Sequence, residues 1–573
     1  MLQTLTTPRG ETLSGTPWQV YPRPQMRRDS YINLNGEWDF AVSSGKPETF
    51  DMRILVPFCP ESRLSGIGRH FEEGAPLWYR RRFLLPEGFR RERVLLHIGA
   101  ADQIAEVFVN GQHLCRHEGG YASFCVDITE ALAEENELVI RCTDDLHDQA
   151  FPYGKQVMNR GGMWYTPVSG IWQTVWLESV PGTYIENLNI ENHGASVTIS
   201  TVPPLEGTVS VEPLGQFPLE NGQVTIAPEN PHFWCPDDPY LYRFTVETAQ
   251  DKVESYFAIR SLEIKKVGGY PRLCLNGKPY FFHGLLDQGY WPEGLLTAPA
   301  PESYADDILA MKRLGFNTLR KHIKVEPEEF YYQCDRLGMI VWQDMVNNSS
   351  YSYFRDTVLP TVGIQKRNDR RLHRDERSRN TFRQGAADAV NQLKNHPCIC
   401  YWTIFNEGWG QFDSDRVCGW FRTLDATRFI DTTSGWFRGK STDVDSRHQY
   451  FGKLRLTGDG LRPLVLSEFG GKTWRVEGHI FNPDKTYGYG ACPTREALNE
   501  AVAALYRESI VPAVEKGLCA AIYTQVSDVE DEVNGLITYD RRVVKLDADT
   551  MLPISRALQD AMEKTVASFE KMG

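Results

Sequence analysis

Two glutamate residues of the chain each close an apolar run, with glycines nearby. Glu407 lies two positions after the apolar run 398–405, and Glu468 directly follows the mostly apolar run 463–467. Continuous apolar runs are typical of strands in a parallel sheet that is covered on both faces, and the glycines that follow permit tight turns. We therefore expect two carboxylates at the C-terminal ends of two buried strands.

A pair of carboxyl groups facing one cavity is the arrangement that glycoside hydrolysis requires. One group protonates the leaving oxygen, while the other acts on the oxocarbenium-like centre from the opposite side of the sugar. Carboxyl groups about 5–5.5 Å apart form a covalent glycosyl-enzyme and retain the anomeric configuration. The alternative, which the sequence leaves open, is that one or both glutamates form ordinary salt bridges at strand ends.

The region after about residue 266 alternates strand-like and helix-like runs, which predicts βα units and a parallel sheet. Helical periodicity is present over about 301–315, 330–338, 376–395 and 495–516. Eight runs read as strands: 280–285, 317–320, 339–344, 398–406, 429–434, 445–450, 464–468 and 519–525. Eight such units predict a closed (β/α)8 TIM barrel, in which chemistry takes place at the C-terminal ends of the strands.

Other polar and aromatic residues at these strand ends could complete a sugar site. Arg320 ends the second strand, where a guanidinium would keep a neighbouring carboxylate ionised, although a barrel-rim ion pair is an equal alternative. Asp287 and Asp344 could bind sugar hydroxyls or cap loops. Trp409 and Trp436 follow strand ends and could pack on the C–H face of a sugar, although a single tryptophan more often belongs to the core.

The chain before the barrel reads as two β-rich regions. Residues 31 to about 180 contain short alternating runs separated by Gly, Pro and Asn, which indicates an antiparallel sandwich or jelly roll. The next region has the size of an immunoglobulin-like sandwich. We therefore expect a jelly-roll domain over 1–180, an immunoglobulin-like domain over 181–265 and a catalytic TIM barrel over 266–573.

Short motifs recur along nearly the whole chain. They lie at residues 34–40, 109–111, 117–121, 127–129 and 169–176, at 233–242, and at 275–279, 317–322, 334–342 and 395–397, leading to Asn406-Glu407. Together these motifs resemble those of glycoside hydrolase family 2, the family of β-galactosidases, β-glucuronidases and β-mannosidases. The resemblance implies a jelly-roll sugar-binding domain, with Glu407 as acid/base and Glu468 as nucleophile.

The resemblance also implies roles for three further residues. Asn406 would donate its amide to the sugar 2-hydroxyl, or alternatively close a strand turn. His448 and Tyr450 occupy positions that the family places near the nucleophile, where the tyrosine hydroxyl could donate to Glu468. Core packing with one satisfied hydrogen bond is an equal alternative for both.

The expected substrate is a small carbohydrate, with β-galactosides first. Glucuronidases of the family carry an Asn-x-Lys element beyond the nucleophile, and none follows Glu468; Asn276-Gly-Lys278 fits the pattern but precedes the first barrel strand. A β-glucuronidase, a β-mannosidase, an α-L-arabinopyranosidase and a catalytically inactive carbohydrate-binding protein remain alternatives.

The charge and composition of the chain limit the kinds of partner and cofactor that we expect it to bind. A net charge of −13 argues against nucleic acids and anionic membranes, and the sequence shows no signal peptide or long apolar span, so we expect a soluble, cytoplasmic protein. The twelve cysteines lack metal or disulfide spacing, so neither a metal nor another cofactor is expected. Self-association and the role of the 350–397 insertion stay open.

Overall fold

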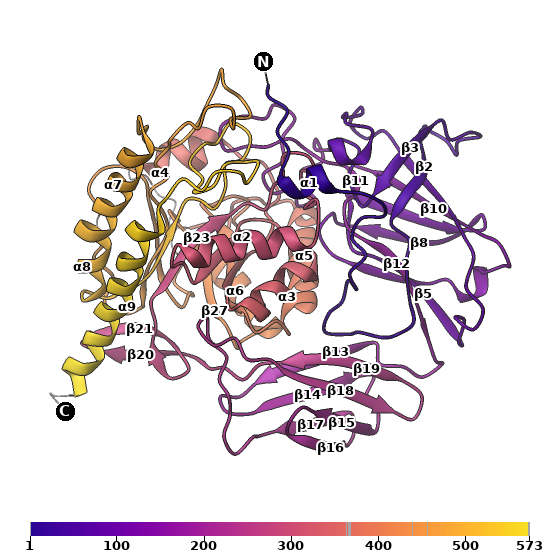
Figure 1. Ribbon diagram of the computed structural model, residues 1–573, viewed down its shortest axis with the longest axis horizontal. Helices are drawn as coiled ribbons and strands as arrows, with labels where there is room; N and C mark the ends of the chain where they lie inside the picture. Colours follow the sequence, from indigo (N-terminus) through magenta and orange to yellow (C-terminus); the bar gives the residue numbers. More distant parts are fainter. Residues whose placement is uncertain (1, 362–363, 365–367, 438, 455, 571–573) are drawn as a thin grey trace.

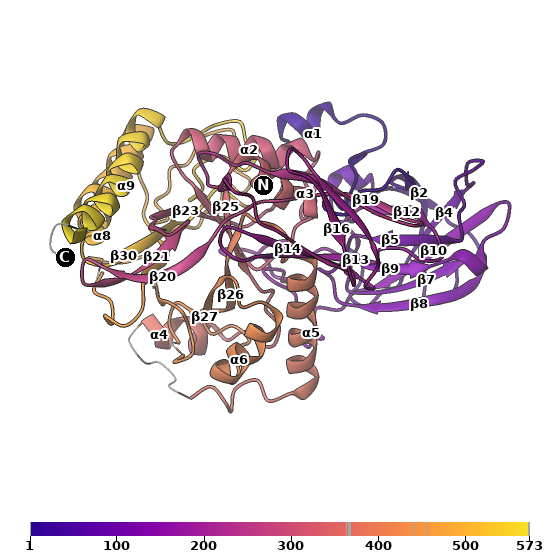
Figure 2. The same cartoon turned by 90° about the horizontal axis from the view of Figure 1, so that it is seen from below.

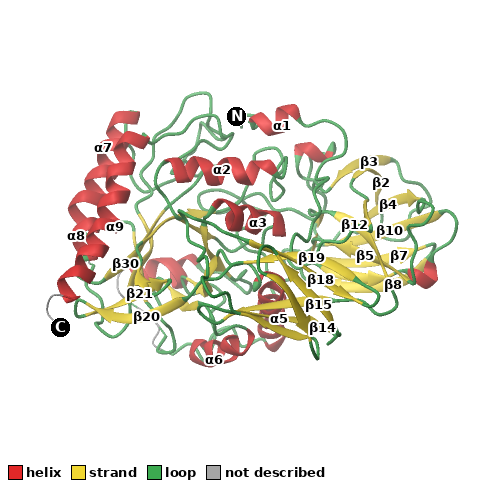
Figure 3. Ribbon diagram, turned by 60° about the horizontal axis from the view of Figure 1, so that its bottom comes forward, coloured by secondary structure: helices red, strands yellow, loops and turns green. Residues whose placement is uncertain are grey.

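The structure is a computed structural model that describes residues 2–361, 364, 368–437, 439–454 and 456–570. Two β-sandwiches lie beside a barrel surrounded by helices (Figure 1), and Figure 3 shows the helices concentrated on the barrel side of the molecule. The predicted combination of jelly roll, immunoglobulin-like sandwich and TIM barrel is confirmed. Within the described part of the chain, no helix has the length and apolar character needed to span a bilayer.

The first sandwich consists of two antiparallel sheets in the orders β1-β12-β5-β9 and β3-β2-β4-β10-β7-β8, and β6 pairs with β11. Burial alternates along β7, so every second side chain enters the core, where Trp38, Phe40 and Tyr79 are fully buried. The strands are β1 (Tyr31–Asn33), β2 (Gly36–Val42), β3 (Met52–Val56), β4 (Leu77–Phe83), β5 (Arg93–Ile98), β6 (Ala101–Asp102), β7 (Ile104–Val109), β8 (Gln112–Glu118), β9 (Phe124–Asp127), β10 (Asn136–Thr143), β11 (Gly170–Ile171) and β12 (Val175–Val180).

The second sandwich packs a three-stranded sheet, β13-β14-β17, on a four-stranded sheet, β16-β15-β18-β19. Its strands are β13 (Asn187–Asn192), β14 (Val197–Val202), β15 (Gly207–Val211), β16 (Gly215–Leu219), β17 (Gln223–Ile226), β18 (Tyr242–Thr248) and β19 (Lys252–Phe257). A small sheet of β20 (Leu262–Val267), β21 (Tyr270–Leu275) and β22 (Lys278–Pro279) follows. The domain boundaries near 180 and 265 stay predictions.

All eight predicted barrel strands are present, and each begins within two residues of its predicted start. They pair in parallel in the order β27-β26-β25-β24-β23-β30-β29-β28. The end strands β27 and β28 contact each other, although no ladder joins them among the described residues. The strands are β23 (Phe282–Asp287), β24 (Thr318–Lys321), β25 (Ile340–Asp344), β26 (Ile399–Asn406), β27 (Phe429–Ser434), β28 (Asp445–Gln449), β29 (Leu464–Phe469) and β30 (Leu518–Tyr523).

The helices lie around these strands (Figure 2). Capping residues in the sequence determine where several of them begin and end. Asp375 caps α5 by accepting from the Ser378 amide at 2.8 Å, and Gly338 ends α3 in the left-handed region at φ 72°. The predicted helix over 495–516 is broken into α7, a π segment and α8. The helices are α1 (Pro8–Thr12), α2 (Glu302–Arg313), α3 (Glu328–Leu337), α4 (Leu359–Thr361), α5 (Glu376–Leu393), α6 (Ser414–Leu424), α7 (Arg495–Leu505), α8 (Val511–Val514) and α9 (Ala548–Glu570), with short 3-10 turns at Arg63–Ser65 and Thr129–Ala131 and π segments at Phe354–Val358 and Tyr506–Ile510.

Candidate active site

Glu407 and Glu468 meet at the C-terminal end of the barrel. Glu407 directly follows β26 and Glu468 lies in β29, and their exposed fractions are 8% and 4%. One carboxyl oxygen of each glutamate and one ring nitrogen of His448 lie within 4.8 Å of one another. This separation fits the spacing of about 5–5.5 Å found in retaining glycosidases and is shorter than the roughly 6.5–9.5 Å of inverting ones.

The backbone at Glu407 is held in an uncommon conformation for a residue with a side chain. Its φ is 50°, a left-handed value that is sparsely populated outside glycine and that persists where the surrounding structure enforces it. The Glu407 amide donates to the Ser434 carbonyl at 2.9 Å, which ties the residue to the end of the neighbouring strand β27. Two neighbouring strands, β26 and β27, therefore fix the backbone that carries the Glu407 carboxylate.

Glu468 is surrounded by groups that stabilise its ionised form. Its Oε1 accepts from Arg320 Nη1 at 3.0 Å, and its Oε2 accepts a short hydrogen bond from the hydroxyl of Tyr450. Burial would raise the pKa of Glu468, but the charges of His448 and Arg320 and the Tyr450 hydrogen bond lower it to about 2. Glu468 is therefore a carboxylate at neutral pH.

Arg320, which lies in β24 and is completely buried, organises the floor of the site. Its Nε donates to both oxygens of Asp344 at 3.0 and 3.1 Å, and its Nη2 donates to Asn406 Oδ1 at 2.8 Å. Asp344 also bonds to His322 Nδ1 at 2.7 Å, so this carboxylate holds Arg320 and His322 in place. Both oxygens of Asp344 are engaged, and we expect it to position Arg320 instead of binding sugar directly.

Asn406 carries a donor that no described residue satisfies. Because its amide oxygen accepts from Arg320, the orientation of the amide is fixed and Nδ2 points elsewhere. That nitrogen is buried and has no hydrogen-bond partner within the described ranges. Buried donors are rarely left unpaired, and a ligand hydroxyl would complete this one.

His448, in β28, links the two glutamates. Its Nδ1 lies 2.8 Å from Glu407 Oε1 and its Nε2 lies 3.6 Å from Glu468 Oε1 and 2.9 Å from Ser434 Oγ. The ring is buried at 6% exposure. His448 therefore fixes the position of Glu407 relative to Glu468.

Aromatic rings border the same end of the barrel. Trp409 stacks on Trp164 with ring centroids 5.3 Å apart, Trp436 meets His448 edge-on at 5.7 Å, and Tyr489 stacks on Tyr450 at 3.9 Å. The indole nitrogens of Trp409 and Trp436 are buried without a partner among the residues described. Such rings provide the apolar faces, and such nitrogens the donors, that a sugar requires.

Asp287 does not join this cluster. Its carboxylate pairs with Lys321 Nζ at 2.7 Å, accepts from the Gly289 amide at 3.0 Å, and borders a hollow shared with Tyr304 and Phe330. Because Lys321 follows Arg320 in the strand, its side chain leaves the opposite face of the barrel wall. Of the two roles expected for Asp287, these contacts favour the loop cap, with a pairing to Lys321, over sugar binding.

Several residues at the site carried no interpretable signal in the sequence. Lys155 and Tyr165 come from the jelly-roll domain, in the irregular segment between β10 and β11. Glu532 lies in the loop after β30, where it accepts a short hydrogen bond from the hydroxyl of Tyr165. The sequence did offer a sign for His322, because this residue follows Arg320 by two positions at the end of a predicted strand.

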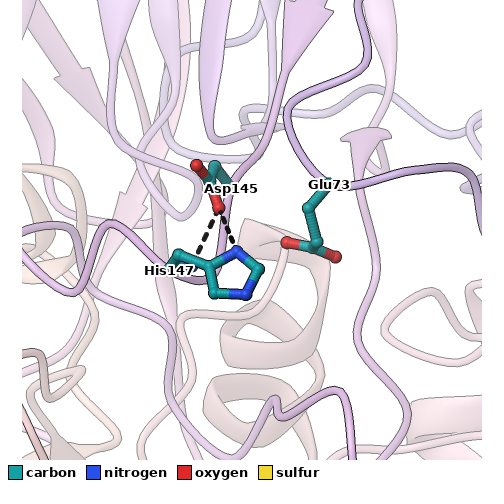
Figure 4. A group of neighbouring side chains, drawn as sticks. All are labelled: Glu73, Asp145 and His147. Carbon is teal, nitrogen blue, oxygen red and sulfur yellow. Dashed lines mark hydrogen bonds and ion pairs between the residues drawn. The ribbon is translucent and has the colours of Figure 1, made fainter.

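Two groups of side chains in the described ranges bring metal-type ligand atoms within 4.8 Å of one another. One is Glu407 with His448 and Glu468. The other is Glu73, Asp145 and His147 in the jelly-roll domain (Figure 4), where Asp145 Oδ1 accepts from the His147 amide at 2.9 Å and lies 2.9 Å from its ring Nδ1. Hydrogen bonds within the protein already engage side chains of both groups. That the protein requires no metal stays a prediction.

The Tyr450 hydrogen bond gives a testable pH effect. Tyr450→Phe removes a donor that favours the charged form of Glu468, so the pKa of Glu468 rises and the acid limb of kcat/KM moves toward neutral pH. At about pH 7 Glu468 is ionised in both proteins, so any loss there, expected to be roughly tenfold, reflects the missing hydrogen bond itself. Profiles of kcat/KM from about pH 2 to 8 measure both effects.

Tyr489→Phe serves as the control, because the Tyr489 hydroxyl bonds to Tyr487 and not to a glutamate. It should leave the acid limb in place. An acid limb that is the same in Tyr450→Phe and the wild type would show that Tyr450 does not stabilise the charged nucleophile.

Three family profiles match successive parts of the chain. They are described as glycosyl hydrolase 2 galactose-binding domain-like, over residues 70–160, glycosyl hydrolases family 2, over 183–260, and glycosyl hydrolases family 2, TIM barrel domain, over 267–454. Each profile falls in the region where the corresponding fold is observed.

Curated relatives are distant and longer than the matched region. The chain is 24% identical to a β-galactosidase of Thermoanaerobacter pseudethanolicus over 57% of this chain and 44% of that protein. It is 22% identical to a β-glucuronidase of Bacteroides fragilis over 66% of this chain and 56% of that protein. The chain thus spans about half the length of these relatives. Six further relatives, 24–26% identical, are named β-glucuronidase or putative β-glucuronidase.

The fold is shared with solved structures. A β-glucuronidase of an uncultured Clostridium sp. superposes with a TM-score of 0.70 at 18% identity, covering 95% of this chain and all of that one. At this identity the similarity establishes the fold alone.

Proposed function

Since the chain belongs to glycoside hydrolase family 2, we propose that it is a retaining exo-β-glycosidase with Glu468 as nucleophile and Glu407 as general acid and base. The observation that carries this proposal is the approach of the two carboxyl groups to within 4.8 Å, with His448 between them. A nucleophile must be ionised, and Arg320 and Tyr450 keep Glu468 in that form.

The reaction follows from this geometry in two displacements. In the first, the Glu468 carboxylate bonds to the anomeric carbon while Glu407 gives its proton to the leaving oxygen, so the aglycone departs as an alcohol. In the second, Glu407 takes a proton from water, whose oxygen displaces Glu468 from the same carbon. Two inversions restore the β configuration, and both glutamates return to their starting protonation states.

The surrounding residues support these steps. His448 holds Glu407 at 2.8 Å, and the free donor of Asn406 is available for the hydroxyl next to the anomeric carbon. A hydrogen bond there strengthens as positive charge develops in the transition state. Trp409 and Trp436 offer apolar surface to the ring carbons.

For the sugar, we propose a β-uronide, with β-glucuronides first. The names of seven relatives support this choice over the β-galactoside expected from the sequence. The β-galactoside remains a second candidate, because one relative is named a β-galactosidase and because no Asn-x-Lys element follows Glu468. The two candidates differ in whether the site receives a negative charge.

A panel of p-nitrophenyl glycosides separates these possibilities. It should contain the β-glucuronide, β-galacturonide, β-galactoside, β-mannoside and α-L-arabinopyranoside, with Glu468→Gln protein as a control for contaminating enzymes. We expect preferred hydrolysis of a β-uronide, with the β-anomer as the first product in NMR spectra. An α-anomer as first product would refute double displacement, and preference for a neutral glycoside would refute the sugar assignment alone.

A further inference from the structure

A segment of the jelly-roll domain reaches the C-terminal end of the barrel. The connection between β10 and β11 carries Tyr153, whose amide donates to Asn347 at 3.0 Å, and Thr166, whose amide donates to Glu530 Oε1 at 2.9 Å. Both partners lie in loops that follow barrel strands. Residues between these two anchors, Lys155 among them, are therefore held against the barrel.

Lys155 is buried among aromatic rings of this region. Its exposed fraction is 6%. The ammonium nitrogen lies 5.0 Å from the ring centroid of Trp409 and 5.9 Å from those of Trp164 and Tyr165. Trp409 is two residues beyond Glu407 in the sequence, and its ring centroid lies 6.3 Å from that of His322, which bonds to Asp344 in the site.

The ammonium of Lys155 differs from other buried lysines in having no carboxylate partner. Lys321, Lys324 and Lys545 are also buried, at 0–1% exposure, and each has a carboxylate oxygen within 2.6–2.8 Å. The ammonium of Lys155 forms no hydrogen bond and no ion pair with any residue that the structure describes, although the Lys155 carbonyl accepts from the Tyr165 amide. A buried charge without a counter-charge is costly, which indicates that its partner arrives with a ligand.

The charge of Lys155 affects the pKa values of two nearby titratable groups, His322 and Glu532. Burial lowers the pKa of His322 to about 4, against the opposing effect of the Asp344 hydrogen bond, and the Lys155 charge adds to the lowering. Burial raises the pKa of Glu532, and Lys155 opposes that rise. The ammonium therefore lies near both groups, while the carboxylate of Glu532 does not come close enough to form an ion pair.

We propose that Lys155 binds the carboxylate of a uronic acid in the sugar subsite and thereby determines specificity for uronides. This inference rests on the proposed β-glycosidase function. It places the recognising cation on the jelly-roll domain, consistent with the lack of an Asn-x-Lys element after Glu468. The rings of Trp164, Tyr165 and Trp409 limit solvent around the ammonium, and an ion pair is stronger where water is excluded.

A different role for Lys155 would be to offset the negative charge of Glu532 and so preserve the local fold. That role predicts equal losses on charged and neutral substrates. It also predicts that Glu532→Gln would repair a Lys155 variant, because the charge to be offset would be gone. Comparing charged with neutral substrates, and testing the double variant, therefore distinguishes binding of a sugar carboxylate from offsetting of the Glu532 charge.

The test compares p-nitrophenyl β-D-glucuronide with the matching β-D-glucoside, which carries CH2OH in place of the carboxylate. In Lys155→Met, the ratio of kcat/KM for glucuronide over glucoside should fall about 100-fold. Lys278→Met, in β22 and away from the site, is the control and should leave the ratio unchanged. An unchanged ratio in Lys155→Met, or recovery of glucuronide hydrolysis in Lys155→Met with Glu532→Gln, would overturn the proposal.

Calorimetric titration with glucuronate and glucose gives a readout that does not need turnover. Glu468→Gln protein should bind glucuronate in preference to glucose, and adding Lys155→Met should abolish the preference. Equal binding of both sugars by Glu468→Gln would refute the role of Lys155 and leave double displacement intact. Failure of the proposed function would instead appear as inversion of configuration in the glycoside panel.

Discussion

Glu468→Gln should lower kcat by on the order of 10⁴- to 10⁶-fold, the scale seen when a covalent nucleophile is removed. The amide has nearly the same shape as the carboxylate but carries no charge and cannot form the glycosyl ester. Of the two donors to Glu468, Arg320 and Tyr450, only one keeps an oxygen acceptor, but the side chain keeps its shape, so folding should persist. Steady-state kinetics on the preferred p-nitrophenyl glycoside measure the loss.

The matched control is Glu500→Gln, an exposed glutamate on α7. It should leave kcat unchanged, and thermal unfolding should confirm that both variants are folded. If folded Glu468→Gln retained more than about a tenth of the wild-type kcat, Glu468 could not be the nucleophile.

Glu407→Ala should lower kcat/KM by about 10²- to 10⁴-fold for a poor leaving group, because no residue then protonates the departing oxygen. An activated leaving group needs less assistance, so the loss should be smaller for p-nitrophenyl glycosides. In the second displacement, azide should enter the space left by the carboxylate and attack the glycosyl-enzyme. The rate should rise with azide concentration, and the product should be the β-glycosyl azide.

The corresponding experiment on Glu468→Ala gives the opposite anomer and so identifies each residue. Azide would then replace the nucleophile itself and produce the α-glycosyl azide in a single inversion. If Glu407→Ala gave the α-azide, the two roles would have to be exchanged. If azide had no effect on Glu407→Ala, the assignment of Glu407 as the acid/base would lose its support.

The sequence predicted the barrel well because its strands are continuous apolar runs with polar residues at their ends. The run 398–405 has the continuous apolar character of a strand covered on both faces, and its end placed Glu407 at the barrel mouth. The same logic left Asp287 open between sugar binding and a loop cap, since a strand end alone does not show which face of the barrel wall a side chain leaves. The pairing with Lys321 depends on packing between the strand and the helical layer.

Contacts between segments that are far apart in the chain could not be predicted from the pattern of apolar and polar residues. His448 meets Glu407 across the barrel end, from β28 to β26, with β27 between them in sequence. The sequence grouped the two residues by their strand ends but gave no distance. Lys155 is a stronger case, because an irregular segment of another domain brings it to the site, and no periodicity predicts where such a segment docks.

Covalent trapping of the intermediate would show whether Glu468 is the nucleophile. A 2-deoxy-2-fluoroglycosyl fluoride of the preferred sugar slows both displacements but keeps a good leaving group, so the glycosyl-enzyme should accumulate. Mass spectrometry of the digested protein should then find the fluorosugar on Glu468. A label on any other residue, or an unlabelled enzyme that turns over the glycoside with inversion, would contradict the account.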